Sequence, residues 1–156
     1  MTSGREVARA LRAAYLALHR QTNACFAKDG VTADQFVLLA ALADGDAVTQ
    51  QDLARRISSD HNTVRAMLLL LEGRGLVARE RHPADGRARC VTLTAKGRRV
   101  FEKLFARSEA LRRRLLAAFR PDEVTALVGL LRRVAEVMAP PASNGSRTTR
   151  RSGSRS

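Results

Sequence analysis

The sequence predicts a mainly α-helical protein with one small β-hairpin near the middle of the chain. Three observations support this fold class. Long stretches on both sides of the middle repeat apolar residues every three or four positions, the period of an amphipathic helix. Only two short segments, residues 76–81 and 89–93, alternate between apolar and polar residues as strands do. The HPADGRA segment between them contains turn-forming residues, so we expect the two strands to pair as a hairpin.

The first expected helix covers residues 5–28. One stripe repeats every three or four positions, close to a heptad seam, and consists of Val7, Leu11, Ala14, Leu18, Thr22 and Cys25. This stripe needs a partner, either later in the chain or on another chain.

Two shorter helices are expected next. Thr32 and Gln35 match a capping box, and the helix that they open ends at Asp44-Gly45-Asp46. Thr49 can cap a second short helix, which includes Leu53 and Ile57.

The stretch from Ser59 to Gly75 predicts the helix around which the chain is organised. Polar residues start it, glycines end it, and its apolar face consists of Val64, Met67, Leu68 and Leu71. The opposite, leading face carries His61, Asn62, Thr63 and Arg65, whose side chains are of the kind that read base edges and phosphates. Together with the preceding short helix, this pattern is typical of a helix-turn-helix that binds DNA.

The hairpin that follows a helix-turn-helix is a wing. Arg81, Arg87 and Arg89 place three cations on it. Wing arginines can enter a narrow minor groove, where the negative potential is concentrated.

Two further amphipathic helices are expected after the wing. Thr94 caps the first, over residues 95–119, and Pro121 with two acidic residues opens the second. The first has Phe101, Leu104, Ser108, Leu111, Leu115 and Ala118 in heptad-like spacing, and the second has an apolar stripe of Val124, Leu127, Leu131, Val134 and Met138. Because a chain of this size has little other apolar surface for such long stripes, we expect a two-fold homodimer with an intermolecular helical bundle.

The expected architecture is a winged helix-turn-helix flanked by long N- and C-terminal dimerisation helices. Its parts are an N-terminal dimerisation helix (1–30), the DNA-binding domain (31–94), C-terminal dimerisation helices (95–139) and a basic tail (140–156). The tail is rich in Ser, Gly and Arg, so we expect it to be disordered.

The charge of the chain favours an anionic partner. The net charge is +13 and the pI about 11.5, and the four arginines of the tail account for only part of this excess. Nucleic acid is the commonest partner of such a domain. No apolar run has membrane-spanning length and the N-terminus does not resemble a signal peptide, so we expect a cytoplasmic, nucleoid-associated protein with no membrane partner.

The sequence shows no pattern typical of a catalytic or metal-binding site. Residues 58–61, Ser-Ser-Asp-His, include the residue types of a catalytic triad, but adjacent positions at a helix start cannot bring base and nucleophile face to face. Cys25 and Cys90 lie far apart and in no metal-ligand spacing. We therefore expect neither an enzyme nor a cofactor.

Residues 53–97 carry a resemblance to a known family. The NTV motif before a leucine-rich helix, the LEGRGLV turn, DGRA at the wing tip and LTAKG after it each resemble the MarR family of bacterial transcriptional regulators, as does VTADQFVLLAAL at residues 31–42. The resemblance implies a homodimeric repressor or activator whose leading helix enters the major groove. It also implies that Arg87 reaches the minor groove, oriented by Asp85. Ala66 stands where many members have a basic residue.

The expected contacts with double-stranded DNA come from the helix-turn-helix and the wing. They are Gln50, Ser59, His61, Asn62, Thr63, Arg65, Arg81, Arg87 and Arg89. The alternative for His61 is a solvated position at a helix start, and for Asn62 and Thr63 a capping role.

The resemblance also suggests where a small aromatic or phenolic effector would bind. In relatives, such effectors bind where the dimer helices meet the winged module, and Tyr15, His19 and Phe36 are our candidates for lining this pocket. The alternative is core packing with a surface histidine. For Cys25 the alternatives are a small apolar residue on the dimer seam and a redox switch, and for Cys90 packing is favoured.

Three function classes follow from these features. The leading one is a sequence-specific dimeric transcription factor, a repressor released by an effector. The second is an architectural DNA-binding protein of low specificity, and the third is a helical module that binds another protein. The basic wing and the polar leading face argue against the third class but do not separate the first two.

Overall fold

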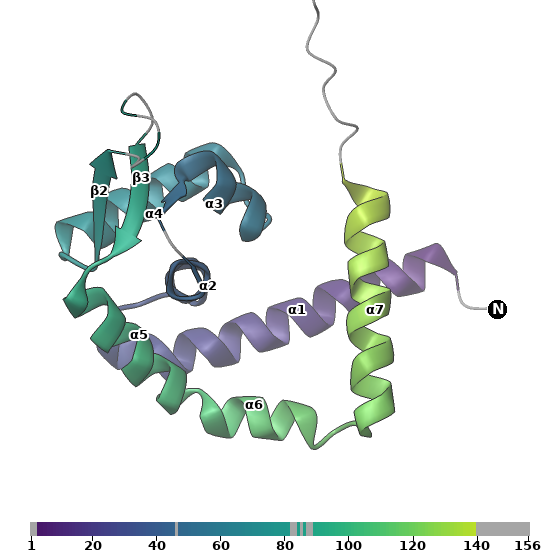
Figure 1. Cartoon of the computed structure of the whole chain (residues 1–156). Coiled ribbons are helices and arrows are strands. Elements are labelled where there is room, and N and C mark those ends of the chain that lie inside the picture. The colour runs from purple at the N-terminus through teal and green to yellow at the C-terminus, as the bar shows by residue number, and fades with distance from the viewer. Residues whose placement is uncertain (1–2, 46, 82–83, 85, 87–88, 140–156) are drawn as a thin grey trace, which may run out of the picture. The chain divides into compact units, whose positions relative to one another are not determined.

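The computed structural model of the protein describes residues 3–45, 47–81, 84, 86 and 89–139, and Figure 1 shows the arrangement of its elements. The chain divides into two units, residues 1–115 and 116–156. The elements are α1 (Gly4–Phe26), η1 (Ala27–Asp29), α2 (Ala33–Ala43), β1 (Val48–Thr49), α3 (Gln50–Arg56), α4 (His61–Gly73), β2 (Val77–Arg81), β3 (Arg89–Leu93), α5 (Ala95–Arg107), α6 (Glu109–Leu116) and α7 (Pro121–Met138).

Threonine side chains cap three helices of the first unit. Thr32 forms both halves of a capping box with Gln35 at the start of α2. The Thr49 hydroxyl accepts a hydrogen bond from the Asp52 amide at the start of α3, and Thr94 caps α5 in the same way. The helix starts predicted at these three residues are confirmed, as is the start of α7 at its proline.

The sheet has one strand more than the sequence predicted. The β2–β3 hairpin is confirmed, with an antiparallel register that runs from Val77 opposite Leu93 to Arg81 opposite Arg89. However, β1 pairs with the other edge of β3, giving the strand order β1-β3-β2, so the expectation of a two-stranded sheet is wrong. A strand of two residues is too short to show the alternation by which strands are recognised.

The core of the first unit surrounds α2, which Figure 1 shows end-on between α3 and α4 on one side and α1 and α5 on the other. Its largest fully buried side chains come from α1, α2, α3, α4, α5, β3 and the residue before β2. They are Phe26, Leu38, Leu39, Leu53, Val64, Leu68, Leu71, Leu76, Cys90 and Leu104. This core holds the helix-turn-helix against the long first helix.

The single helix predicted over residues 95–119 is wrong, because the chain breaks it at Ser108 into α5 and α6. The Ser108 hydroxyl and the Arg112 guanidinium both donate to the carbonyl oxygen of Phe105, at 2.9 and 2.8 Å. The guanidinium also lies 3.8 Å above the centre of the Phe105 ring. Side chains that bind backbone carbonyls in this way compete with the regular hydrogen bonds of a helix.

A polar cluster on Asp29 joins the end of α1 to α5. The Asp29 carboxylate, whose side chain is 10% exposed, pairs with Lys103 at 2.8 Å and with Arg107. The hydrogen bond from Lys103, together with the charges of both cations, lowers the pKa of this carboxyl group. Arg74, at the end of α4, donates to the carbonyl oxygens of Asp29 and Gly30.

The lowered pKa of Asp29 predicts a loss of stability in acid. Because the folded pKa lies below the unfolded value near 3.8, the stabilisation is complete above that value and is lost as the pH falls through the folded pKa. In Asp29→Asn we expect a lower midpoint of urea denaturation at neutral pH and a shallower decline below about pH 4. Asp44→Asn is the control, because this exposed carboxylate has no ion-pair partner among the described residues. If the urea midpoint fell equally steeply below about pH 4 in wild type and in Asp29→Asn, the prediction would be wrong.

Candidate nucleic-acid interface

The turn between α3 and α4 sets the direction of α4. Ser58 has a left-handed backbone conformation, with φ of 53°, and the Ser59 amide donates to the Ala54 carbonyl at 2.9 Å. Asp60 then caps α4 through the Thr63 amide. A tight turn into a capped helix is the local geometry expected of a helix-turn-helix.

The apolar face predicted for α4 is confirmed. Val64, Met67, Leu68 and Leu71 are buried in the core. Leu69 and Leu70, by contrast, are 54% and 61% exposed, and nothing in the structure explains two leucines there.

The leading face of α4 is exposed and polar. Asn62 and Arg65 are exposed, and within the described part of the chain neither side chain has a polar partner. His61 is also exposed, and its Nε2 lies 3.1 Å from Nε2 of Gln50, at the start of α3. Three predicted contact residues of α4 and one of α3 are therefore adjacent on one surface.

Thr63 acts as part of the helix cap. Its hydroxyl donates to Asp60 at 2.5 Å, and this bond is the largest cause of the lowered pKa of the Asp60 carboxyl group. The hydroxyl oxygen keeps its lone pairs for accepting a further hydrogen bond. Ser59 is only half-buried and borders the same end of α4.

The wing brings two arginines together. Arg81 and Arg89 are both exposed and are directly opposite one another in the β2–β3 register, so their side chains leave the same face of the hairpin. Like charges at opposed positions destabilise a hairpin, which an anionic ligand between them would relieve. Arg87 and Asp85, the other wing residues of the prediction, lie outside the described residues.

Arg79 ties the wing to α4. Its Nε lies 3.3 Å from the Glu72 carboxylate, an ion pair whose geometry falls short of a hydrogen bond. The Arg79 side chain is 23% exposed, and it lies in the middle of β2. The ion pair therefore contributes to the spacing between the hairpin and the helix.

Comparison with known proteins agrees with this geometry. A model of the MarR family matches residues 29–88. Among solved structures, this chain is similar to BpsR of Bordetella bronchiseptica, a protein whose DNA binding is regulated by 6-hydroxynicotinic acid. The two are 32% identical with a TM-score of 0.77, and the match covers 87% of this chain and 97% of the BpsR chain. The chain belongs to the MarR family.

Two further proteins are similar to this chain. A mutant of MarR from E. coli, complexed with operator DNA, is 27% identical with a TM-score of 0.74 over 82% of this chain and 92% of that one. The HTH-type transcriptional regulator YdgJ of Bacillus subtilis is 31% identical over 67% of this chain. The aligned region spans 64% of the length of YdgJ. The winged helix of this MarR-family protein is thus the fold of a transcriptional regulator.

Two neighbouring cavities lie where α1 and α2 meet the helix-turn-helix. The smaller, of about 120 Å³, is lined by α1 and α2, and the larger, of about 530 Å³, extends to Ser58 and to Thr63 of α4. Both share Tyr15, Asp34 and Val37 in their walls. We call the two together the effector cavity, after the role that the sequence led us to expect for Tyr15 and His19.

The structure brings together two of the three predicted effector residues. The rings of Tyr15 and His19 lie 5.4 Å apart at this cavity. Phe36 does not line it, and packs between Phe26 and Phe101, at 4.7 and 5.6 Å between ring centres. The sequence prediction missed Asp34 and Val37, which α2 presents to the cavity instead.

The cysteines lie in different surroundings. Cys90 is buried in β3, in agreement with a packing role, and its thiol points at the Glu80 carbonyl oxygen. Cys25 is partly exposed, 3.6 Å from the Arg107 carbonyl oxygen. In the described ranges, no cluster of His, Cys, Asp or Glu has the composition of a metal site. Nor is any described helix both long and apolar enough to cross a membrane.

Proposed function

We propose that the protein is a homodimeric, sequence-specific DNA-binding repressor of transcription, in which α4 of each subunit enters the major groove of a palindromic operator. The observation that carries this proposal is the leading face of α4, where Asn62 and Arg65 are exposed and have no polar partner among the described residues. Asparagine can bind adenine and arginine can bind guanine through paired hydrogen bonds. Gln50, Ser59, His61 and Thr63 border this face and complete the proposed contact surface of the helix-turn-helix.

The wing would supply contacts with the DNA backbone and the minor groove. Arg81 and Arg89 leave one face of the hairpin, and Arg87 belongs to the segment between them. We assign these three arginines to phosphate or minor-groove contacts, with Asp85 orienting Arg87. Cations in these roles raise affinity for any DNA and position α4 for reading bases.

Dimerisation would use the helices outside the DNA-binding domain. On α1, Val7 and Leu18 are each 45% exposed, and α7 exposes an apolar set of its own. Its members are Leu127, Val128, Leu130, Leu131, Val137 and Met138. A second copy would bury these surfaces, with residues 1–30 and 95–139 as dimerisation helices around the domain of residues 31–94. The tail assigned to residues 140–156 lies outside the described residues. Its four arginines contribute to the net charge of the chain.

Regulation would act through the effector cavity. A ligand there would touch α1, α2, the turn before α4 and Thr63 of α4 itself. Binding could therefore favour a position of α4 that does not fit two adjacent major grooves. We assign this cavity to a small aromatic or phenolic effector, with Tyr15 and His19 among its contacts, and place the protein in the cytoplasm on nucleoid DNA.

The proposal is tested by selecting genomic fragments with the purified protein at near-physiological salt, followed by footprinting. We expect an inverted repeat with half-sites about one helical turn apart, near 10 bp, and a preference over unrelated DNA of about 10³ or more. The charge of +13 also allows an architectural protein of low specificity. Recovery of unrelated fragments with long, uninterrupted protection would favour that function instead.

A further inference from the structure

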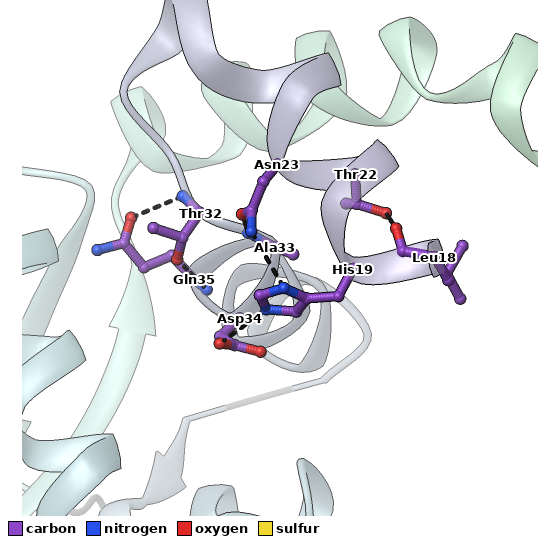
Figure 2. Close-up of polar contacts among 8 residues, drawn as sticks. All are labelled: Leu18, His19, Thr22, Asn23, Thr32, Ala33, Asp34 and Gln35. Atoms are coloured by element: carbon purple, nitrogen blue, oxygen red, sulfur yellow. Dashed lines mark hydrogen bonds and ion pairs between the residues drawn. The ribbon is translucent and has the colours of Figure 1, made fainter. Parts of the chain in front are cut away.

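Asn23 connects α1 to the first turn of α2, and its orientation is determined by the backbone. Its Oδ1 accepts a hydrogen bond from the Ala33 amide at 2.7 Å, as Figure 2 shows. A backbone N–H can only donate, so the atom that faces it must be the oxygen of the side-chain amide. The Nδ2 group of Asn23 therefore faces the other way, toward His19.

This orientation determines the tautomer of His19. Asn23 Nδ2 lies 3.1 Å from His19 Nδ1. Because the Nδ2 group can only donate, His19 Nδ1 must accept and carries no hydrogen. The ring hydrogen is then on Nε2, which donates to Asp34 Oδ2 at 3.2 Å (Figure 2). A doubly protonated ring would place two N–H groups against each other at Asn23.

The part of the effector cavity that one chain supplies consequently carries a net negative charge. Its ionisable wall residues are Tyr15, His19 and Asp34, and within the described part of the chain no lysine or arginine lines it. His19 is neutral in the tautomer that Asn23 imposes, and a tyrosine is neutral at physiological pH. The Asp34 carboxylate, with its side chain 57% exposed, is left without a full positive charge beside it.

The other groups of the cavity suit a small ligand with an apolar body. Val37, Ile57 and Met67 supply apolar surface, and Ser58 and Thr63 supply hydroxyl groups. These hydroxyls form hydrogen bonds with neutral partners, and none of them neutralises an anion. A ligand carboxylate would therefore meet Asp34 without a compensating cation, whereas an ammonium group would pair with it.

We propose that the effector cavity binds an aromatic amine or another cationic or donor-rich aromatic molecule, in preference to an aromatic carboxylate. This inference rests on the proposed function and specifies the ligand class of the same cavity. It sets this chain apart from BpsR, whose DNA binding is regulated by 6-hydroxynicotinic acid.

The test compares two probes that share a phenol ring and the same spacer, 4-(2-aminoethyl)phenol and 3-(4-hydroxyphenyl)propionate. Calorimetric titrations are run at about pH 8, where an alkyl ammonium and a carboxylate both carry their charge. We expect the amine to bind the full-length protein at least about tenfold more tightly than the acid. Asp34→Asn should abolish this preference, and Asp44→Asn, which makes the same charge change outside the cavity, should keep it.

A measurement without any ligand tests the same argument. In a ¹⁵N spectrum of the imidazole groups at about pH 8, we expect His19 to show a protonated Nε2 and an unprotonated Nδ1. The opposite tautomer would overturn the inference, as would tighter or equal binding of the acid, or no binding of the amine. In each of these outcomes, selection of an inverted repeat from genomic DNA would still support the proposed function, so the two failures are distinguishable.

Discussion

Replacing Gly97 with alanine is expected to lower the free energy of unfolding by roughly 3 kcal/mol, the largest stability loss that we predict for a change of one methyl group. Gly97 lies in the first turn of α5, where its amide donates to the Thr94 hydroxyl at 2.9 Å. A Cβ atom added there would overlap the carbonyl oxygen of Leu76 and lie 2.8 Å from its carbonyl carbon. Leu76 is buried and its carbonyl oxygen already accepts the Thr94 amide, so this segment of backbone is held in place.

The sign of this prediction is opposite to the intrinsic preference of helices. Within a helix, alanine is ordinarily more stable than glycine by about 1 kcal/mol. Gly73→Ala is the matched control, because Gly73 is helical and its added Cβ would meet nothing within 4 Å. Urea denaturation at one protein concentration should show a much lower midpoint for Gly97→Ala and an unchanged or higher midpoint for Gly73→Ala. Equal midpoints in the two variants would mean that α5 does not approach Leu76 as closely as described.

Arg65→Ala is expected to cause the largest loss of DNA affinity among single substitutions on α4. A guanidinium that pairs with a guanine contributes about 1–3 kcal/mol at each half-site, so a dimer on a palindrome should lose about 2–6 kcal/mol. The unfolding midpoint should not change, because Arg65 is exposed and has no ion-pair partner among the described residues.

The control for Arg65 is Arg20→Ala, which removes the same charge from an exposed position on α1. Fluorescence anisotropy with the selected operator, at several salt concentrations, measures both variants. Arg20→Ala should bind the operator with an affinity within a few fold of wild type, since Arg20 lies outside the proposed DNA-contact surface of α3, α4 and the wing. If Arg65→Ala and Arg20→Ala lose the same small amount, Arg65 contributes only general electrostatic attraction.

Local patterns made much of the fold predictable from the sequence. The caps at Thr32, Thr49 and Thr94 depend on residues three positions away, and the buried stripe of α4 depends on one helical period. The turn residues between residues 81 and 89 marked the hairpin. These features need no knowledge of distant contacts.

Two of the features that the sequence did not predict depend on distant contacts, and the third, the end of α5, depends on local side-chain contacts. β1 is recognisable only by its pairing with β3, because two residues carry no period. The end of α5 depends on side chains that bind the Phe105 carbonyl, and a heptad pattern that continues through Ser108 conceals it. The close approach of Gly97 to Leu76 is likewise a tertiary contact.

In the candidate site, too, local patterns predicted some features and tertiary contacts decided others. The polar leading face of α4 could be predicted because Val64, Met67 and Leu71 recur at the helical period on the opposite face. In α2, by contrast, FVLLAALA is apolar around the whole helix, so periodicity could not decide whether Phe36 or Val37 faces Tyr15. Phe36 packs instead with two other phenylalanines, and the polar chain from Asn23 to Asp34 is formed only when α1 and α2 come together.

The most direct test of the central claim, that the leading face of α4 reads bases, is a selection from randomised duplex DNA by wild type and Asn62→Ala in parallel. Our account predicts an inverted repeat for wild type, and loss of the base preference at one matching position in each half-site for the variant. The preferences at all other positions should remain, since Asn62 is exposed and has no polar partner among the described residues. Identical base preferences for the two proteins would contradict the account.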